Sequence, residues 1–99
     1  MGTKEEVKID SDIELMLQEI TKKQDMYNLI LFNDDNHDMI EVAKQLVKAV
    51  KCAHDKALKI MMSAHQSGQA VAMTDTKDKV TTAGNILQAI DLAIDIIKA

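Results

Sequence analysis

Residues 27–36, YNLILFNDDN, place a run of strand-forming side chains directly before a cluster of turn-forming ones. Aromatic and branched aliphatic residues favour an extended backbone, whereas Asn and Asp favour turns because their side chains bond nearby backbone amides. The stretch therefore predicts a buried strand over residues 27–32 that runs straight into a polar loop.

The rest of the chain alternates helical and extended patterns. Apolar side chains at helical spacing predict a helix over residues 39–50, a second over about 53–66, and a third that begins after Asp75. Residues 69–74 and 92–97 are predicted as strands. The order β-α-α-β-α-β indicates an α+β fold, a two-layer sandwich in which a small three-stranded sheet carries helices packed on one face.

Local signals mark the ends of these helices. Asp38, followed by Glu41 three residues later, has the pattern of a capping box, and Asp75 is expected to cap the third helix. Gly68 suits the left-handed conformation that commonly closes a helix. We therefore expect short, well-defined connections between these elements.

Length and charge limit the classes of function. Ninety-nine residues allow one small domain, and 12 basic against 16 acidic residues give a net charge of −4. The chain offers no basic stripe, and its aromatic side chains are limited to Tyr27 and Phe32. We therefore expect no nucleic-acid partner, because neither phosphate binding nor base stacking has the residues it needs.

Cysteine content and hydropathy bear on the compartment. The single cysteine, Cys52, has no partner for an internal disulfide, which is typical of a reducing environment. No apolar run is long enough to cross a bilayer, and the first residues lack the apolar core of a signal peptide. We expect a cytoplasmic protein without a membrane partner, and nothing in the sequence requires more than a monomer.

Residues 1–25 differ from the rest of the chain. Charged and polar side chains dominate, although apolar residues at helical spacing within residues 11–21 allow a short amphipathic helix. A helix of that length is only marginally stable alone. We expect a mobile N-terminal extension over residues 1–25 and one folded domain over residues 26–99.

The loop after the first predicted strand is the densest polar cluster of the chain. Asn and Asp are common there simply as turn and cap residues. Alternatively, oxygens of Asn33 and Asp34 converge on an ammonium group, which carries only hydrogen-bond donors. His65 is then either an ordinary boundary residue of the second helix or a third acceptor at that site.

Metal binding and catalysis have little support. The loop lacks the glycine and the closing Glu of an EF-hand. Cys52 and His54 diverge on a helix, so a zinc site that also uses His37 and His65 has no paired ligand spacing. Ser63 does not face His65, and there is no glycine-rich phosphate loop. We expect no metal, no cofactor and no enzymatic activity.

Several of these segments together resemble the ClpS family. The resemblance rests on the strand that runs into residues 33–35, NDD, on Met39, and on residues 60–65, IMMSAH, followed by Gly68. It covers about residues 27–99. It implies an adaptor that binds proteins with a free bulky hydrophobic N-terminal residue, an N-degron, and delivers them to a Clp AAA+ unfoldase of the ClpA or ClpC type for degradation.

The resemblance also implies a role for individual residues. Asn33, Asp34 and His65 would hold the free α-amino group of the substrate, and Asp35 and His37 would support the loop. The implied hydrophobic pocket is lined by Met39, Val42, Met61, Ala64 and Leu92. The implied contacts to the unfoldase, near the start of the third predicted helix, are Asp78 and Lys79.

The chain departs from the family pattern at several positions. His37 and Asp38 stand where the family usually has Thr-Pro, and Ala64 stands where it usually has Val. The connection to the last strand is compressed, and Leu92 is expected to take the place of a pocket-closing leucine there. A degenerate ClpS-like domain without N-degron binding is therefore an alternative.

A second alternative is a protein-interaction domain of the ribosomal-stalk kind. The β-α-α-β-α-β order also resembles the C-terminal domain of the ribosomal stalk protein, which contacts partner factors through a helix face. That domain lacks an Asn-Asp-Asp loop and is rich in Lys and Gly, unlike this chain with its three glycines. A cavity surrounded by Asn33, Asp34 and His65 would distinguish the adaptor from both alternatives.

Overall fold

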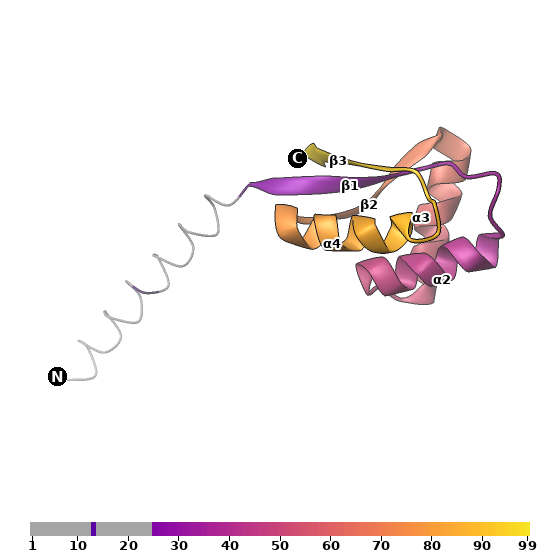
Figure 1. Ribbon diagram of the computed structural model, residues 1–99, viewed down its shortest axis with the longest axis horizontal. Coiled ribbons are helices and arrows are strands. Elements are labelled where there is room, and N and C mark those ends of the chain that lie inside the picture. Colours follow the sequence, from indigo (N-terminus) through magenta and orange to yellow (C-terminus); the bar gives the residue numbers. More distant parts are fainter. Residues whose placement is uncertain (1–12, 14–24) are drawn as a thin grey trace.

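The computed structural model describes residue 13 and residues 25–99 (Figure 1). The elements follow in the order β1 (Met26–Phe32), α2 (Met39–Val50), α3 (His54–Ser67), β2 (Gln69–Thr76), α4 (Lys77–Gln88) and β3 (Ile94–Lys98). In the described part of the chain, the helices lie on one face of the three-stranded sheet. The predicted α+β architecture is confirmed, whereas the predicted N-terminal extension and its helix over residues 11–21 lie outside the described residues, apart from residues 13 and 25.

The first predicted strand is the central strand of the sheet. β1 pairs antiparallel with β2 along one edge and with β3 along the other, in the order β2-β1-β3. Leu29 faces Met73 on one side and Ile96 on the other, and the register with β2 shifts between Leu29 and Ile30. A nearly continuous apolar run suits this position, because both edges of the strand are hydrogen-bonded and its inner face is buried.

The core lies between the sheet and the helices. Leu29 and Leu31 of β1, Leu46 of α2 and Leu87 of α4 are almost completely buried there. Gly84 brings α4 close to the sheet, since a Cβ atom at this position would lie 3.3 Å from the Ile94 side chain and 3.4 Å from that of Leu29. α4 therefore packs closely against β1, the strand that leads into the polar loop.

One predicted helix cap is confirmed in position and the other is wrong. Asp38 is the N-cap residue of α2, but its side chain makes no capping hydrogen bond, so the expected box with Glu41 is not formed. Asp75 belongs to β2, where its carboxylate accepts a hydrogen bond from the Thr76 N–H, and α4 begins after Thr76. The strand is longer than predicted because β1 already starts at Met26, which pairs with Thr76.

The connection from α4 to β3 turns more sharply than predicted. Asp91 has a φ of 62°, a left-handed conformation that Asp tolerates better than most residues. The last strand consequently starts at Ile94 and not at Leu92. Leu92 precedes the strand and is 2% exposed in the core.

The end of α3 has the predicted glycine geometry. Gly68 has a φ of 86°, and its N–H donates to the Ala64 carbonyl over 2.8 Å. Its own carbonyl accepts a hydrogen bond of 2.9 Å from the N–H of Asn33, the first residue after β1. The left-handed turn therefore joins the end of α3 to the beginning of the polar loop.

We expect Gly68→Ala to lower the free energy of unfolding by about 1–2 kcal/mol, because a Cβ atom crowds its own backbone in the left-handed region. Steric contact with neighbours contributes nothing, since no atom lies within 4 Å of the added Cβ. Gly68→Asn should cost less, because Asn adopts this conformation more readily. Urea unfolding of both variants measures the difference, and an Ala variant as stable as the parent would contradict the argument.

Candidate functional site

A cavity of about 320 Å³ opens where the polar loop meets α2 and α3. This volume lies at the lower end of the range typical of small-ligand sites. Its polar lining comprises Asn33, Asp34, Asp35, His37 and His65. Its apolar lining includes Met39, Val42, Met61, Met62 and Ala64. One hollow therefore combines a group of acceptors with an apolar pocket.

Backbone hydrogen bonds at the end of β1 position the polar side of this cavity. The Phe32 N–H donates to the Ala93 carbonyl over 3.1 Å, and the Asn33 N–H donates to the Gly68 carbonyl over 2.9 Å. The chain leaves the sheet between these two fixed points, beside the last turn of α3. The loop side chains are consequently held next to the side chains at the end of that helix.

Asn33 and His65 meet at this junction, although they lie 32 positions apart in the sequence. The Nδ1 atom of His65 lies 3.3 Å from Oδ1 of Asn33. The Asn33 amide donates in turn to Oδ1 of Asp35 over 3.3 Å. Both distances are long for hydrogen bonds, so these groups can exchange partners at little cost.

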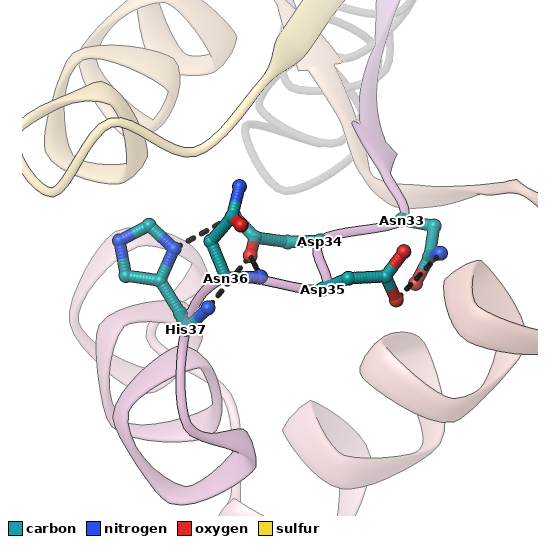
Figure 2. Close-up of polar contacts among 5 residues, drawn as sticks. All are labelled: Asn33, Asp34, Asp35, Asn36 and His37. Atoms are coloured by element: carbon teal, nitrogen blue, oxygen red, sulfur yellow. Dashed lines mark hydrogen bonds and ion pairs between the residues drawn. The ribbon is translucent and has the colours of Figure 1, made fainter.

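The Asp34 carboxylate is turned toward its own loop, as Figure 2 shows. Its Oδ1 atom accepts hydrogen bonds from the N–H groups of Asn36 and His37, over 2.7 and 2.8 Å. Its Oδ2 atom lies 2.7 Å from Nδ1 of the His37 ring. Asp34 lines the same cavity as Asn33 and His65, but its partner in this structure is His37.

The pairing shifts the pKa values of both partners. Burial raises the pKa of Asp34, but the hydrogen bonds from the backbone N–H groups of His37 and Asn36 and from the His37 ring outweigh it and lower that pKa overall. The hydrogen bond to Asp34 is the main reason why the pKa of His37 is raised, and burial opposes it. The site thus favours a carboxylate beside an imidazolium.

The apolar half of the cavity lies between α2 and α3. Met39 and Val42 are one turn apart on α2, and Met61 and Ala64 are one turn apart on α3. Met61 and Ala64 are buried, whereas Met39 is 54% exposed at the mouth. The small side chain of Ala64 leaves room in the pocket, and the flexible thioether side chains of Met39 and Met61 adapt to apolar groups of different shape.

Leu92 is the one predicted pocket residue that the structure places elsewhere. It does not line the cavity but packs in the core, because the turn at Asp91 directs the chain inward before β3 begins. Sequence reasoning also missed Phe32 and Met62, which do line the cavity. Met62 is adjacent to an inward-facing residue and 38% exposed, so helical spacing gave no signal for it.

Asp78 and Lys79 line a second cavity of about 440 Å³, which has no lining residue in common with the first. It lies between the end of α2, β2 and the start of α4, and it also includes Lys51 and Asp75. Both predicted residues are exposed. These two hollows in the described part of the chain are therefore separate: the first joins acceptors to an apolar pocket, and the second carries charges of both signs.

Cys52 is a half-buried thiol outside any disulfide. The described residues contain no group of three His, Cys, Asp or Glu side chains that could hold a metal ion. None of the helices in the described part of the chain is long and apolar enough to span a membrane.

The sequence is similar to a known protein family and to individual known proteins. Residues 22–93 match the family model described as ATP-dependent Clp protease adaptor protein ClpS. The chain is 35% identical over 72 residues to the ATP-dependent Clp protease adapter protein ClpS of Lawsonia intracellularis, an alignment that covers 73% of this chain and 66% of that protein. It is 26% identical over 85 residues to the E3 ubiquitin-protein ligase ubr-1 of Caenorhabditis elegans, covering 86% of this chain and 4% of that protein.

A solved structure shares the fold. Agrobacterium tumefaciens ClpS2 bound to L-phenylalaninamide matches with a TM-score of 0.72 and 22% sequence identity, over 78% of this chain and 100% of that chain. The family match includes β1, the polar loop, α2 and α3, which together form the first cavity. The chain belongs to the family of ATP-dependent Clp protease adaptor proteins known as ClpS.

Proposed function

We propose that this chain is a non-enzymatic adaptor that binds proteins through a free, bulky hydrophobic N-terminal residue and delivers them to a Clp AAA+ unfoldase. One observation carries the proposal: a single cavity joins the acceptors Asn33, Asp34 and His65 to an apolar pocket. The start of a polypeptide has an ammonium group on the same carbon as its first side chain. Such a residue can fill both halves of the cavity at once, whereas an internal residue cannot.

The polar half has the acceptors that an ammonium group needs. The Oδ1 atom of Asn33 and Nδ1 of His65 lie 3.3 Å from one another, and their weak mutual contact can be replaced by bonds to the ligand. Asp34 adds a negative charge, since the hydrogen bonds to its carboxylate keep its pKa below the ordinary value. That charge favours the protonated amine, whose ordinary pKa is about 7.7–8.0.

The apolar half provides affinity for the first side chain. Burial of one large apolar side chain contributes about 1.5–3 kcal/mol, and each charge-assisted hydrogen bond contributes about 1.5–3 kcal/mol. The loss of free motion on association removes several kcal/mol of this gain, so a Kd on the order of micromolar is expected. The ligand of Agrobacterium tumefaciens ClpS2, L-phenylalaninamide, combines the same two groups, which supports this ligand class here.

The alternatives explain less of the structure. Membership of the ClpS family sets aside the ribosomal-stalk domain. A degenerate ClpS-like domain would not need Met61, Ala64 and His65 to leave an open cavity beside the polar loop, yet they do so here. The retained cavity therefore supports N-degron binding.

We place the contact with the unfoldase at the second cavity. An adaptor holds its substrate and its unfoldase at the same time, so it needs a surface separate from the substrate site. Asp78 and Lys79 present opposite charges at the start of α4, and Asp75 and Lys51 extend this mixed pattern around the hollow. A patterned charged surface orients a partner more than it adds affinity. We further propose that the chain acts as a cytoplasmic monomer.

A peptide with a free N-terminal Phe should bind with a Kd on the order of micromolar. The acetylated form of the same peptide should bind at least about 100-fold more weakly, because acetylation removes the charge and two of the donors. A peptide that begins with Gly isolates the contribution of the apolar pocket. Isothermal titration of the three peptides measures these differences, and equal binding of the free and acetylated forms would exclude the proposed function.

Asp34→Asn should weaken binding of the free-amino peptide by about 2 kcal/mol, because the amide keeps an oxygen for the loop N–H groups but removes the charge. Asp38→Asn is the matched control, since it makes the same charge change in the same loop at a side chain without a capping hydrogen bond. The control should bind within about twofold of the parent. Equal weakening by both variants would show that Asp34 acts only through the net charge of the loop.

Asp78→Lys and Lys79→Glu should slow degradation of a Phe-initiated reporter by a Clp unfoldase and its peptidase, because charge reversal places like charges across the contact. Neither variant should change peptide affinity, since neither residue lines the first cavity. Lys56→Glu is the control, because this exposed residue lines neither hollow. Unchanged degradation rates for both reversals would remove the second cavity as the docking surface.

A further inference from the structure

His37 is paired with the Asp34 carboxylate of the site. Its ring Nδ1 lies 2.7 Å from Oδ2 of Asp34, and its backbone N–H bonds Oδ1 of the same carboxylate over 2.8 Å. Figure 2 shows the Asp34 carboxylate between His37 and Asn36, while Asn33 is turned the other way, toward Asp35. The charge that an incoming amine would use is thus already paired with a side chain of the loop.

The surroundings of His37 favour its protonated form. The carboxylates of Asp34, in its own loop, and of Glu41, on α2, stabilise its positive charge. The backbone of Ile90, in the turn after α4, acts in the same direction. Among the other residues that line the cavity, Asp35 can carry a negative charge and His65, on α3, can carry a positive one.

An ammonium group and an imidazolium cannot share this carboxylate without loss. The Oδ1 atom of Asp34 already accepts two backbone hydrogen bonds, so both cations depend on Oδ2 and repel one another there. On the basis of the function proposed above, we propose that His37 is a positioning residue that competes with the substrate amine for Asp34 and releases its proton when the amine binds. Binding of an N-terminal residue is therefore coupled to proton release from the loop.

The sign of the pH dependence follows from this competition. The pairing with Asp34 raises the pKa of His37, so its ring keeps the proton to a higher pH than an ordinary histidine does. As the pH rises through that pKa, the ring becomes neutral and the amine gains access to the carboxylate, so affinity increases. Above about pH 8 the substrate amine loses its own proton, and affinity falls again.

His37→Asn separates hydrogen bonding from titration. The Nδ2 atom of Asn lies close to where Nδ1 of His lies, so it can still donate to Asp34 but carries no charge at any pH. His54→Asn is the matched control, because His54 is an exposed residue at the start of α3 that lines neither cavity.

The experiment is isothermal titration of a free-amino Phe peptide between about pH 6 and about pH 8, in buffers of different ionisation enthalpy that report protons released on binding. His37→Asn should bind the peptide about tenfold more tightly than the parent near pH 6 and equally near pH 8. Peptide binding should also release fewer protons from this variant than from the parent, because Asn does not titrate. His54→Asn should match the parent throughout. In the parent, an NMR titration should show that the peptide lowers the pKa of the His37 ring.

The remaining outcomes contradict either the competition between His37 and the amine or the proposed function itself. Identical pH profiles and proton release for parent and His37→Asn, or a pKa of His37 that the peptide does not change, would overturn the competition while leaving the proposed function intact. Weaker binding by His37→Asn at every pH would show that the ring only supports the loop, which also overturns it. Failure of the parent to prefer the free-amino peptide over its acetylated form at any pH would instead remove the proposed function.

Discussion

The site depends on two backbone hydrogen bonds at the end of the central strand. The N–H groups of Phe32 and Asn33 donate in opposite directions, to the carbonyls of Ala93 and Gly68. The first ties the exit of β1 to the segment before β3, and the second ties it to the end of α3. These bonds convert a loop of Asn and Asp residues, which otherwise has many accessible conformations, into one wall of a cavity. The left-handed conformation of Gly68 is what lets α3 end at the place where its carbonyl meets Asn33.

Much of the fold and of the apolar pocket could be predicted because it depends on periodicity. The run over residues 27–32 has the pattern of a central strand, and helical spacing groups Met39 with Val42 on α2 and Met61 with Ala64 on α3. That these four residues line one pocket was implied by the family resemblance. The residue types left the meeting of Asn33 and His65 as one of two alternatives, and the family resemblance favoured it. Local spacing carries no information about contacts between residues so distant in sequence.

The features that could not be predicted depend on backbone geometry at single residues. The turn at Asp91 sends Leu92 into the core, and no propensity distinguishes this from the extended chain that was expected. The Asp34 side chain was assigned to a substrate, but the loop folds so that its nearest donors are the N–H groups and the ring of His37. Which of several competing donors a carboxylate selects is decided by the loop conformation, and the composition of the loop does not reveal that choice.

Polar and apolar recognition are divided between elements of different rigidity. The apolar walls stand on α2 and α3, which pack into the common core through Leu46, Ala57 and Ile60. Two of the acceptors, Asn33 and Asp34, stand on a loop with several internal hydrogen bonds, which are short at Asp34 and long, 3.3 Å, at Asn33. A first side chain would therefore meet a preformed pocket, whereas its amino group would exchange existing hydrogen bonds within the loop. Such an arrangement gives selectivity for a chain terminus, because only a terminus provides donors in sufficient number to compensate the bonds that are broken.

The central claim is tested most directly by a crystal structure of this protein with a short peptide that begins with a free Phe. The account predicts that the peptide α-nitrogen lies within hydrogen-bond distance of Asn33 Oδ1 and of the His65 ring, with the Phe side chain between Met39 and Ala64. A peptide bound at another surface, or one whose amino group points to solvent while the cavity stays empty, would contradict it.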